Sequence, residues 1–304
     1  MPTVSPETGA ARVLSRDLGR GQAAGTGAGR PHLGVAADAA GLLAGRTIAV
    51  LTGAGMSTDS GIPDYRGPDS PPRNPMTYQQ FVADPVSRRH YWARNHVGWR
   101  HVRDTAPNDG HRALARLEGA GLLSGLITQN IDRLHTRAGS RHVIDLHGTY
   151  ADVVCLSCGN RTARADLAPR LEALNPGFAD TAEVADAEIA PDADAVLATT
   201  DGFRVADCLV CGGLLKPDIV FFGENVPRAR VAAAYAVVDA ADVLLVAGSS
   251  LTVMSGLRFV RHAARVDMPV VIVNRGPTRG DDLATLTVDA GCSPTLGTIA
   301  DALA

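Results

Sequence analysis

Short, uninterrupted apolar runs recur along the chain and predict buried strands. They occupy residues 48–51, 125–128, 243–246 and 270–273. A strand covered by helices on both faces is apolar at every position, so such runs are typical of a parallel sheet. Stretches with helical spacing, among them 111–119 and 228–241, predict the crossover helices of βαβ units. The pattern therefore predicts an α/β fold with a Rossmann-like doubly wound parallel sheet.

Small or polar residues follow these predicted strands. The first strand leads into Thr52 and Gly53, and the last leads into Asn274 and Arg275. In a doubly wound sheet the carboxyl ends of the strands line the crevice that binds the ligand. We therefore expect the four strand endings to face one crevice.

Two C-x-x-C pairs interrupt the strand pattern and predict a metal site. The pairs are Cys155 with Cys158 and Cys208 with Cys211, and only Cys292 is left over. Two thiolates from each of two tight knuckles form the usual ligand set of a structural tetrahedral zinc. A thioredoxin-type redox pair is the alternative, but a dithiol enzyme needs one pair rather than two. The sequence therefore predicts one structural Zn²⁺ per chain.

The cysteines also define the predicted domains. Residues 151–218 contain both pairs and lack buried-strand runs, and the segment 172–207 within them carries nine acidic residues and one arginine. We interpret 151–218 as a small zinc module, held together by its metal, inserted into a Rossmann-type domain of residues 36–150 and 219–304. Residues 1–35 are rich in Gly, Ala and Arg without periodicity and predict a disordered tail. A mitochondrial presequence is the alternative interpretation of this tail.

Composition narrows the class of protein. The 304 residues are 45% hydrophobic and 20% charged, as in a soluble globular protein. The formal net charge of −3 argues against a protein that grips nucleic acid or an anionic membrane. No apolar run is long enough for a membrane span, and no secretory signal is evident, so we expect a cytoplasmic protein. Lys216 is the only lysine among 29 basic residues, which fits a GC-rich genome.

A glycine-containing turn directly after the first strand points to nucleotide binding. The segment 53–57, GAGMS, lets the backbone approach a pyrophosphate, and a following helix N-terminus would supply N–H donors. The third glycine of the G-x-G-x-x-G pattern is absent, because Thr58 occupies its position. This turn alone is weak evidence for nucleotide binding.

Motifs further along carry a more specific resemblance. They are GAGMSTDSGIPDYRGP at 53–68, TQNIDRLH at 128–135, LHG at 146–148, LKPDIVFFGE at 215–224 and GSSL at 248–251. In this order they resemble the motifs of the sirtuins (Sir2 family), the NAD-dependent protein deacylases, from about residue 40 to the C-terminus. Both cysteine pairs lie between LHG and LKP, where that family has its zinc. YWARN at 91–95 and GPTR at 276–279 resemble the class II, sirtuin-4-like branch, and the lysine-poor composition favours a bacterial member.

The resemblance implies a residue for each part of the NAD site. Asp64, Tyr65 and Arg66 would form the mobile loop over the nicotinamide, and Asn130 and Asp132 would position its ribose and amide. The remaining implied cofactor contacts are Gly53, Ala54, Gly55, Ser57, Gln129, Ile131, Gly248, Ser249, Ser250, Asn274, Arg275, Gly276 and the backbone of Cys292.

The resemblance also implies that His147 is the catalytic base, with Asn130 and Asp132 completing the catalytic set. Nicotinamide is a good leaving group, and after it leaves a base must activate a ribose hydroxyl that attacks the acyl carbon. Histidine has a pKa suited to that task. The implied products are nicotinamide and O-acyl-ADP-ribose.

The acyl-lysine protein substrate is expected beside the same crevice. Its peptide would add as an extended strand between residues 249–252 and the segment Val220, Phe221, Phe222, Gly223 and Glu224. Tyr91 and Arg94 stand three apart in a predicted helix, 89–99, and resemble the pair with which desuccinylating sirtuins bind an acyl carboxylate. Alternatively, Arg94 is a solvated or salt-bridged helix residue and Tyr91 packs in the core.

Two departures from the family pattern leave the acyl group open. Arg133 replaces the small residue usual after Asp132, and Ser255-Gly256 stands where many deacetylases have a proline-bearing loop. Other activities also stay open, namely mono-ADP-ribosyl transfer, lipoyl- or biotinyl-lysine amidase activity, and a non-catalytic NAD-binding interaction module. The sequence does not determine the target proteins or the oligomeric state, a monomer included.

Overall fold

The computed structural model describes residues 32–65, 75–180, 195, 197 and 199–304. Within them, parallel strands form a seven-stranded sheet in the order β1-β10-β9-β8-β2-β3-β4. Its strands are β1 (His32–Leu33), β2 (Ile48–Thr52), β3 (Leu123–Thr128), β4 (Val143–Asp145), β8 (Val243–Ala247), β9 (Val270–Asn274) and β10 (Leu286–Asp289). The chain order reverses between β2 and β8, so the ligand crevice of a doubly wound sheet lies at their carboxyl ends. The predicted fold class is confirmed.

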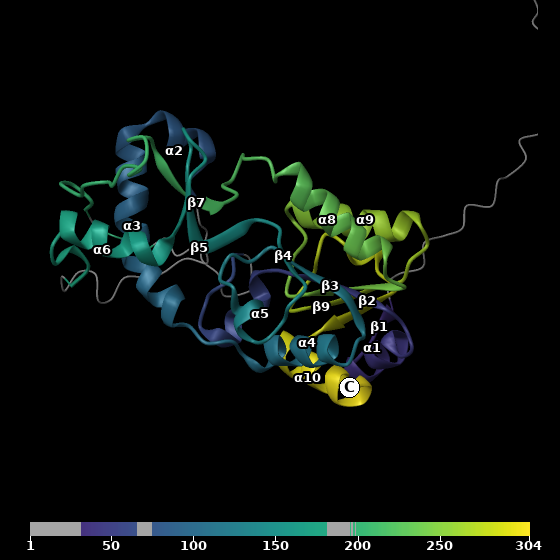
Figure 1. The fold of residues 1–304 in the computed structure, drawn as a ribbon. Helices are drawn as coiled ribbons and strands as arrows, with labels where there is room; N and C mark the ends of the chain where they lie inside the picture. The colour runs from purple at the N-terminus through teal and green to yellow at the C-terminus, as the bar shows by residue number, and fades with distance from the viewer. Residues whose placement is uncertain (1–31, 66–74, 181–194, 196, 198) are drawn as a thin grey trace, which may run out of the picture. The chain divides into compact units, whose positions relative to one another are not determined.

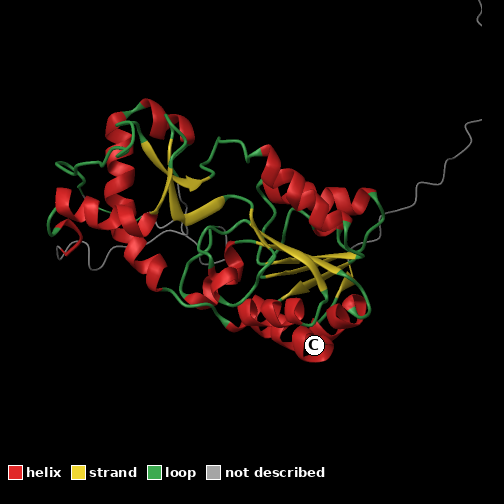
Figure 2. Ribbon diagram, viewed as in Figure 1, coloured by secondary structure: helices red, strands yellow, loops and turns green. Residues whose placement is uncertain are grey.

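Helices cover both faces of this sheet (Figures 1 and 2). On one face pack α1 (Ala36–Leu43), α4 (Asp109–Gly119) and α10 (Cys292–Leu303), and on the other pack α8 (Arg228–Asp239) and α9 (Met254–Arg265). Every residue of β2 and β8 is buried, because each of these strands has a neighbouring strand on either side and helices above and below. The uninterrupted apolar runs in the sequence reflect this double burial.

A second, smaller sheet has the order β6-β5-β7 and is antiparallel. Its strands are β5 (Gly148–Cys155), β6 (Arg161–Ala163) and β7 (Leu215–Ile219), and α6 (Arg164–Leu174) lies against β5 and β6. Its hydrophobic core also contains Phe81 of α2 (Tyr78–Ala83) and Trp92 of α3 (Pro85–Asp104). The smaller lobe therefore draws on two separate parts of the chain, because helices that precede the predicted module of residues 151–218 share its hydrophobic core.

The start of the Rossmann-type domain also differs from the prediction. His32 and Leu33 form β1, which pairs in parallel with β10, so the predicted tail of residues 1–35 extends too far into the folded part. Residues 1–31 lie outside the described residues. None of the helices in the described residues combines the length and the apolar composition that a membrane span requires.

Candidate active site

Two glycine turns interlock where the strand order reverses. A Cβ atom at Gly53, after β2, would lie 2.8 Å from the carbonyl oxygen of Gly248, after β8. Gly248 has a φ of +65°, and a Cβ atom there would lie 2.3 Å from the backbone nitrogen of Met56. Glycine is therefore required at both turns. The bare backbone of this cradle, which continues into the short helical turn Ala54–Met56, fits the pyrophosphate of a dinucleotide.

A cavity of about 380 Å³ opens beside the cradle. It brings together most of the residues that the sequence assigned to NAD, namely Gly53, Ala54, Gly55, Ser57, Asp64, Tyr65, Gln129, Asn130, Ile131, Asp132, Gly248, Ser249, Ser250, Asn274 and Arg275. His147, Tyr91 and the whole segment 220–224 line it as well. Gly276 and Cys292 are not among the described residues that line it, and Arg66 lies outside the described residues.

Cys292 is buried beneath the strand ends rather than beside the cavity. Its Sγ lies 3.9 Å from the carbonyl oxygen of Val273, and burial raises the pKa of the thiol to about 12. The side chain therefore stays a neutral thiol, which agrees with its interpretation as a small residue without thiol chemistry.

Three polar side chains from two strand ends form one hydrogen-bonded cluster. Ser57 Oγ donates to Asp132 Oδ2 at 2.7 Å, and Asn130 Nδ2 donates to Ser57 Oγ at 3.0 Å. The backbone N–H of Leu134 donates to Asp132 Oδ1 at 2.8 Å. Burial raises the pKa of Asp132, and these hydrogen bonds oppose the rise because they stabilise the carboxylate. The cluster holds an amide and a carboxyl group in fixed positions on the cavity wall.

His147 is held through both ring nitrogens. Nδ1 lies 2.9 Å from the carbonyl oxygen of Gln129, and Nε2 lies 2.8 Å from Ser255 Oγ. A carbonyl oxygen can only accept, so the proton is on Nδ1 and the lone pair is on Nε2. Burial lowers the pKa of His147 to about 4, so the ring is neutral at physiological pH. A neutral imidazole with a fixed tautomer has the form that a general base requires.

The bulky cation of Arg133 does not enter this cavity. Arg133 has a φ of +62° and directly precedes α5 (Leu134–Arg137), and it is not among the described residues that line the cavity. Its guanidinium instead acts on Asp145 at the end of β4. Burial raises the pKa of Asp145 to about 6, and the charge of Arg133 opposes that rise.

Tyr91 and Arg94 have different surroundings in the structure. Tyr91 lines the cavity, and its hydroxyl lies 3.3 Å from that of Tyr150. Arg94 is not among the described residues that line the cavity, and its Nε donates to the carbonyl oxygen of Ala195 at 2.6 Å. Its Nη1 also lies 3.0 Å from His90 Nε2. The geometry therefore does not present the two side chains as one clasp for an acyl carboxylate.

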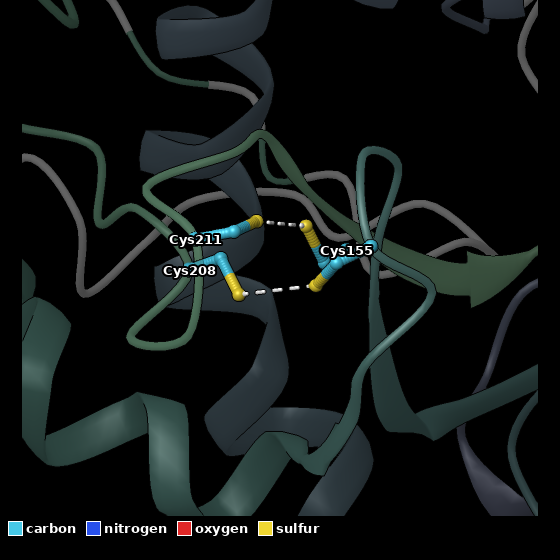
Figure 3. A group of neighbouring side chains, drawn as sticks. Cys155, Cys208 and Cys211 are labelled. Carbon is cyan, nitrogen blue, oxygen red and sulfur yellow. Dashed lines mark hydrogen bonds between the residues drawn. The ribbon is translucent and has the colours of Figure 1, made fainter.

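The four paired cysteines converge in the smaller lobe (Figure 3). Their sulfur atoms all lie within 4.8 Å of one another, with 3.5 Å between Cys155 and Cys211 and 3.8 Å between Cys158 and Cys208. Zn–S bonds of about 2.3 Å place the sulfurs of a tetrahedral site about 3.8 Å apart. The four thiols are thus positioned to bind a structural metal ion, consistent with zinc.

Matching turns form the two cysteine knuckles. The N–H of Gly159 donates to the carbonyl oxygen of Cys155 at 2.9 Å, and that of Gly212 donates to Cys208 at the same distance. Both glycines have a positive φ, +72° and +68°, which a residue with a side chain rarely adopts. The C-x-x-C-G spacing therefore encodes the shape of each knuckle.

A buried histidine pair lies behind the glycine cradle. The rings of His111 and His135 are 4.7 Å apart, and His135 Nε2 lies 2.9 Å from Thr52 Oγ1 at the end of β2. Burial lowers the pKa of His111 to about 4 and that of His135 well below its ordinary value. The folded protein therefore keeps both rings neutral at pH values where the unfolded chain protonates them.

Stability is expected to fall as the pH drops from about 6.5 to 4, where the unfolded state alone binds these protons. Between pH 7 and 5, protonation of His111 in the unfolded state lowers the unfolding free energy by about 2 kcal/mol. His111→Leu should abolish this part of the pH dependence. Urea denaturation at both pH values measures this difference. The same change at exposed His101 is the control, and an equal pH dependence in wild type and His111→Leu would contradict the assignment.

Comparison with known proteins places this site in a family. The model of the Sir2 family matches residues 53–255. The chain is 66% identical to NAD-dependent protein deacetylase 1 of Mycobacterium avium (strain 104) over 86% of this chain and 93% of the relative. It is 54% identical to NAD-dependent protein deacetylase 1 of Streptomyces coelicolor over 90% of this chain and 91% of the relative. The chain belongs to the Sir2 family.

Solved structures agree with this membership. A Sir2 homolog–NAD complex superposes with a TM-score of 0.68 at 28% identity and covers 89% of this chain and 94% of its own. Sir2Tm bound to a propionylated peptide gives a TM-score of 0.66 at 31% identity over 86% of this chain and 94% of its own. The protein therefore has the sirtuin fold.

Proposed function

We propose that the chain is an NAD-dependent protein-lysine deacylase, which transfers the acyl group to ADP-ribose and releases nicotinamide. One observation carries the proposal: a glycine cradle, the Ser57–Asn130–Asp132 cluster and the neutral base His147 line a single cavity. The names of the bacterial relatives support the reaction, and the related complexes with NAD and with an acylated peptide support the two substrates.

Each part of the cavity has a task in this reaction. The cradle around Gly53 and Gly248 would hold the pyrophosphate, and Asn130 and Asp132 would orient the nicotinamide end. Bound NAD would supply a good leaving group and the ribose hydroxyl that accepts the acyl group. His147 Nε2 would accept the proton of that hydroxyl, once the hydroxyl replaces Ser255 Oγ as its hydrogen-bond donor.

The substrate side of the proposal is an acylated protein. The segment 220–224 and residues 249–252 both line the cavity, and a peptide strand between them would bind mainly through its backbone. The YWARN and GPTR motifs support a place in the class II branch, and the bacterial relatives support an enzyme of the bacterial cytoplasm. An intact set of His147, Asn130 and Asp132 argues against a non-catalytic interaction module.

A panel of acyl-lysine peptides tests the proposed function. Incubation with NAD should release nicotinamide and yield one O-acyl-ADP-ribose for each lysine freed. Transfer of ADP-ribose to protein without loss of the acyl group would instead identify a mono-ADP-ribosyltransferase. Release restricted to lipoyl- or biotinyl-lysine would identify an amidase of that narrower type.

The same panel tests the role of Arg94. We expect Arg94→Met to lower the removal of succinyl and acetyl groups by similar factors, because Arg94 contacts Ala195 and His90 rather than the cavity. Tyr91→Phe, which changes one hydroxyl on the cavity wall, is the companion variant. A selective loss of desuccinylation in Arg94→Met would instead support the carboxylate clasp with Tyr91.

A further inference from the structure

Ser255 places a hydroxyl group directly on the catalytic base. Its Oγ lies 2.8 Å from His147 Nε2, across 108 residues of sequence, and the serine is only 8% exposed. Because Nδ1 of His147 donates to the carbonyl oxygen of Gln129, Nε2 carries the lone pair, and the Ser255 hydroxyl must be the donor. The Ser255 hydroxyl is thus paired with a base, His147, and the carbonyl oxygen of Gln129 orients that base. This is the arrangement of an activated serine nucleophile.

The surrounding backbone fixes this arrangement. Ser255 lies in the first turn of α9, and a Cβ atom at the next residue, Gly256, would lie 2.7 Å from Gln129 Nε2. The helix therefore packs directly on the residue whose carbonyl oxygen orients His147. The side chain of Gln129 is itself held, because Ser249 Oγ donates to its Oε1 at 2.7 Å.

The cavity can also stabilise the charge that acyl transfer develops. Val253, Met254 and Ser255, at the N-terminus of α9, all line it. The N-terminus of this twelve-residue helix carries partial positive charge, which favours an oxyanion formed beside Ser255. The Ser255 hydroxyl, the His147 ring and the N-terminus of α9 therefore all lie at the cavity. They supply a nucleophile, its base and a partial positive charge for the oxyanion.

We propose that Ser255 and His147 give this protein a second activity, the NAD-independent hydrolysis of small carboxylic esters. The proposed deacylase reaction requires the cavity to hold an acyl carbon close to the group that is hydrogen-bonded to His147. In the structure this group is Ser255 Oγ, so an acyl compound is the expected substrate. An ester of an acidic alcohol fits best, since its leaving oxygen needs little help from a weakly basic imidazole.

The reaction proceeds in two balanced steps. Ser255 Oγ attacks the acyl carbon while its proton passes to His147 Nε2, and the ester oxygen leaves with that proton. An acyl-serine and an alcohol result. Water then attacks the acyl-serine, giving one proton to Nε2, and the departing Ser255 Oγ takes this proton back. The products are the carboxylic acid and the free enzyme, without any oxidant or reductant.

Hydrolysis of 4-nitrophenyl acetate by the full-length protein without NAD tests this activity. We expect Ser255→Ala and His147→Ala each to lower the enzyme-catalysed rate by about 10²-fold. Ser124→Ala is the matched control, because this serine of β3 bonds to backbone carbonyl groups and is not among the described residues that line the cavity. Its rate should equal that of the wild type.

Mass spectrometry of the wild-type protein gives a readout that does not depend on a folded variant. A fluorophosphonate probe should modify Ser255, and prior saturation of the cavity with NAD should prevent the modification. Equal ester hydrolysis in wild type and Ser255→Ala, or a probe adduct on another residue, would overturn the proposal. Deacylation of an acyl-lysine peptide in the presence of NAD is measured separately, so failure of the esterase leaves the deacylase assignment intact.

Discussion

Replacing His147 by alanine is expected to abolish acyl transfer while NAD still binds. The imidazole acts as a base on a hydroxyl of a cofactor that is already seated, and the glycine cradle and the Asn130–Asp132 pair do not depend on it. Loss of a positioned general base costs about 10²–10⁴-fold in rate. Product formation measures the loss, and isothermal titration with NAD measures the retained affinity.

The pH dependence of the reaction checks the same assignment. Because burial lowers the pKa of His147 to about 4, the base is neutral above that pH and becomes protonated below it. The rate should therefore fall on the acid side near pH 4 rather than near 6.5. His262→Ala, a histidine that pairs with Asp239 on the helical face, is a control and should keep full activity. Near-wild-type acyl transfer by His147→Ala would show that another group is the base.

Removal of the metal should unfold the smaller lobe and thereby inactivate the protein. Four thiolates close a tetrahedral sphere and leave no position for a reactive water, so the metal has a structural role. The binding of a structural zinc contributes about 10–16 kcal/mol in small metal-dependent domains. Elemental analysis should find one zinc per chain, and chelation should reduce the far-ultraviolet circular dichroism and the activity together.

Cys158→Ser is the sharper variant for this test. Cys158 is exposed, whereas Cys155 is buried in the core of the lobe, where serine would also disturb packing. Cys292→Ser removes a thiol far from the cluster in the sequence and should retain the full zinc content. A Cys158→Ser protein that stays folded and active without zinc, or a redox-active disulfide in place of the metal, would refute the structural role.

The sequence alone predicted those features that depend on residues close together along the chain. The strands β2, β8 and β9 are apolar at nearly every position because each lies inside the sheet, and β3 has a shorter apolar run at Leu126 and Ile127. Their positions and the fold class could therefore be predicted. The knuckles could be predicted as well, since two residues between cysteines and a following glycine dictate one tight turn. The short strands β4 and β10 escaped prediction because three or four residues carry too little pattern.

Contacts between distant residues required the folded chain. The sequence of α3 does not show which of the two sheets its aromatic residues pack against. In the structure they pack on β5 and β7 of the smaller sheet. Spacing suggests that Tyr91 and Arg94 share a helix face, but of the two only Tyr91 is among the described residues that line the cavity. Arg94 donates to the backbone carbonyl group of Ala195, a contact that helical periodicity does not encode. Ser255 appeared in sequence only as a departure from a family loop. Its hydrogen bond to His147 exists because α9 packs on Gln129, a contact that no local pattern encodes.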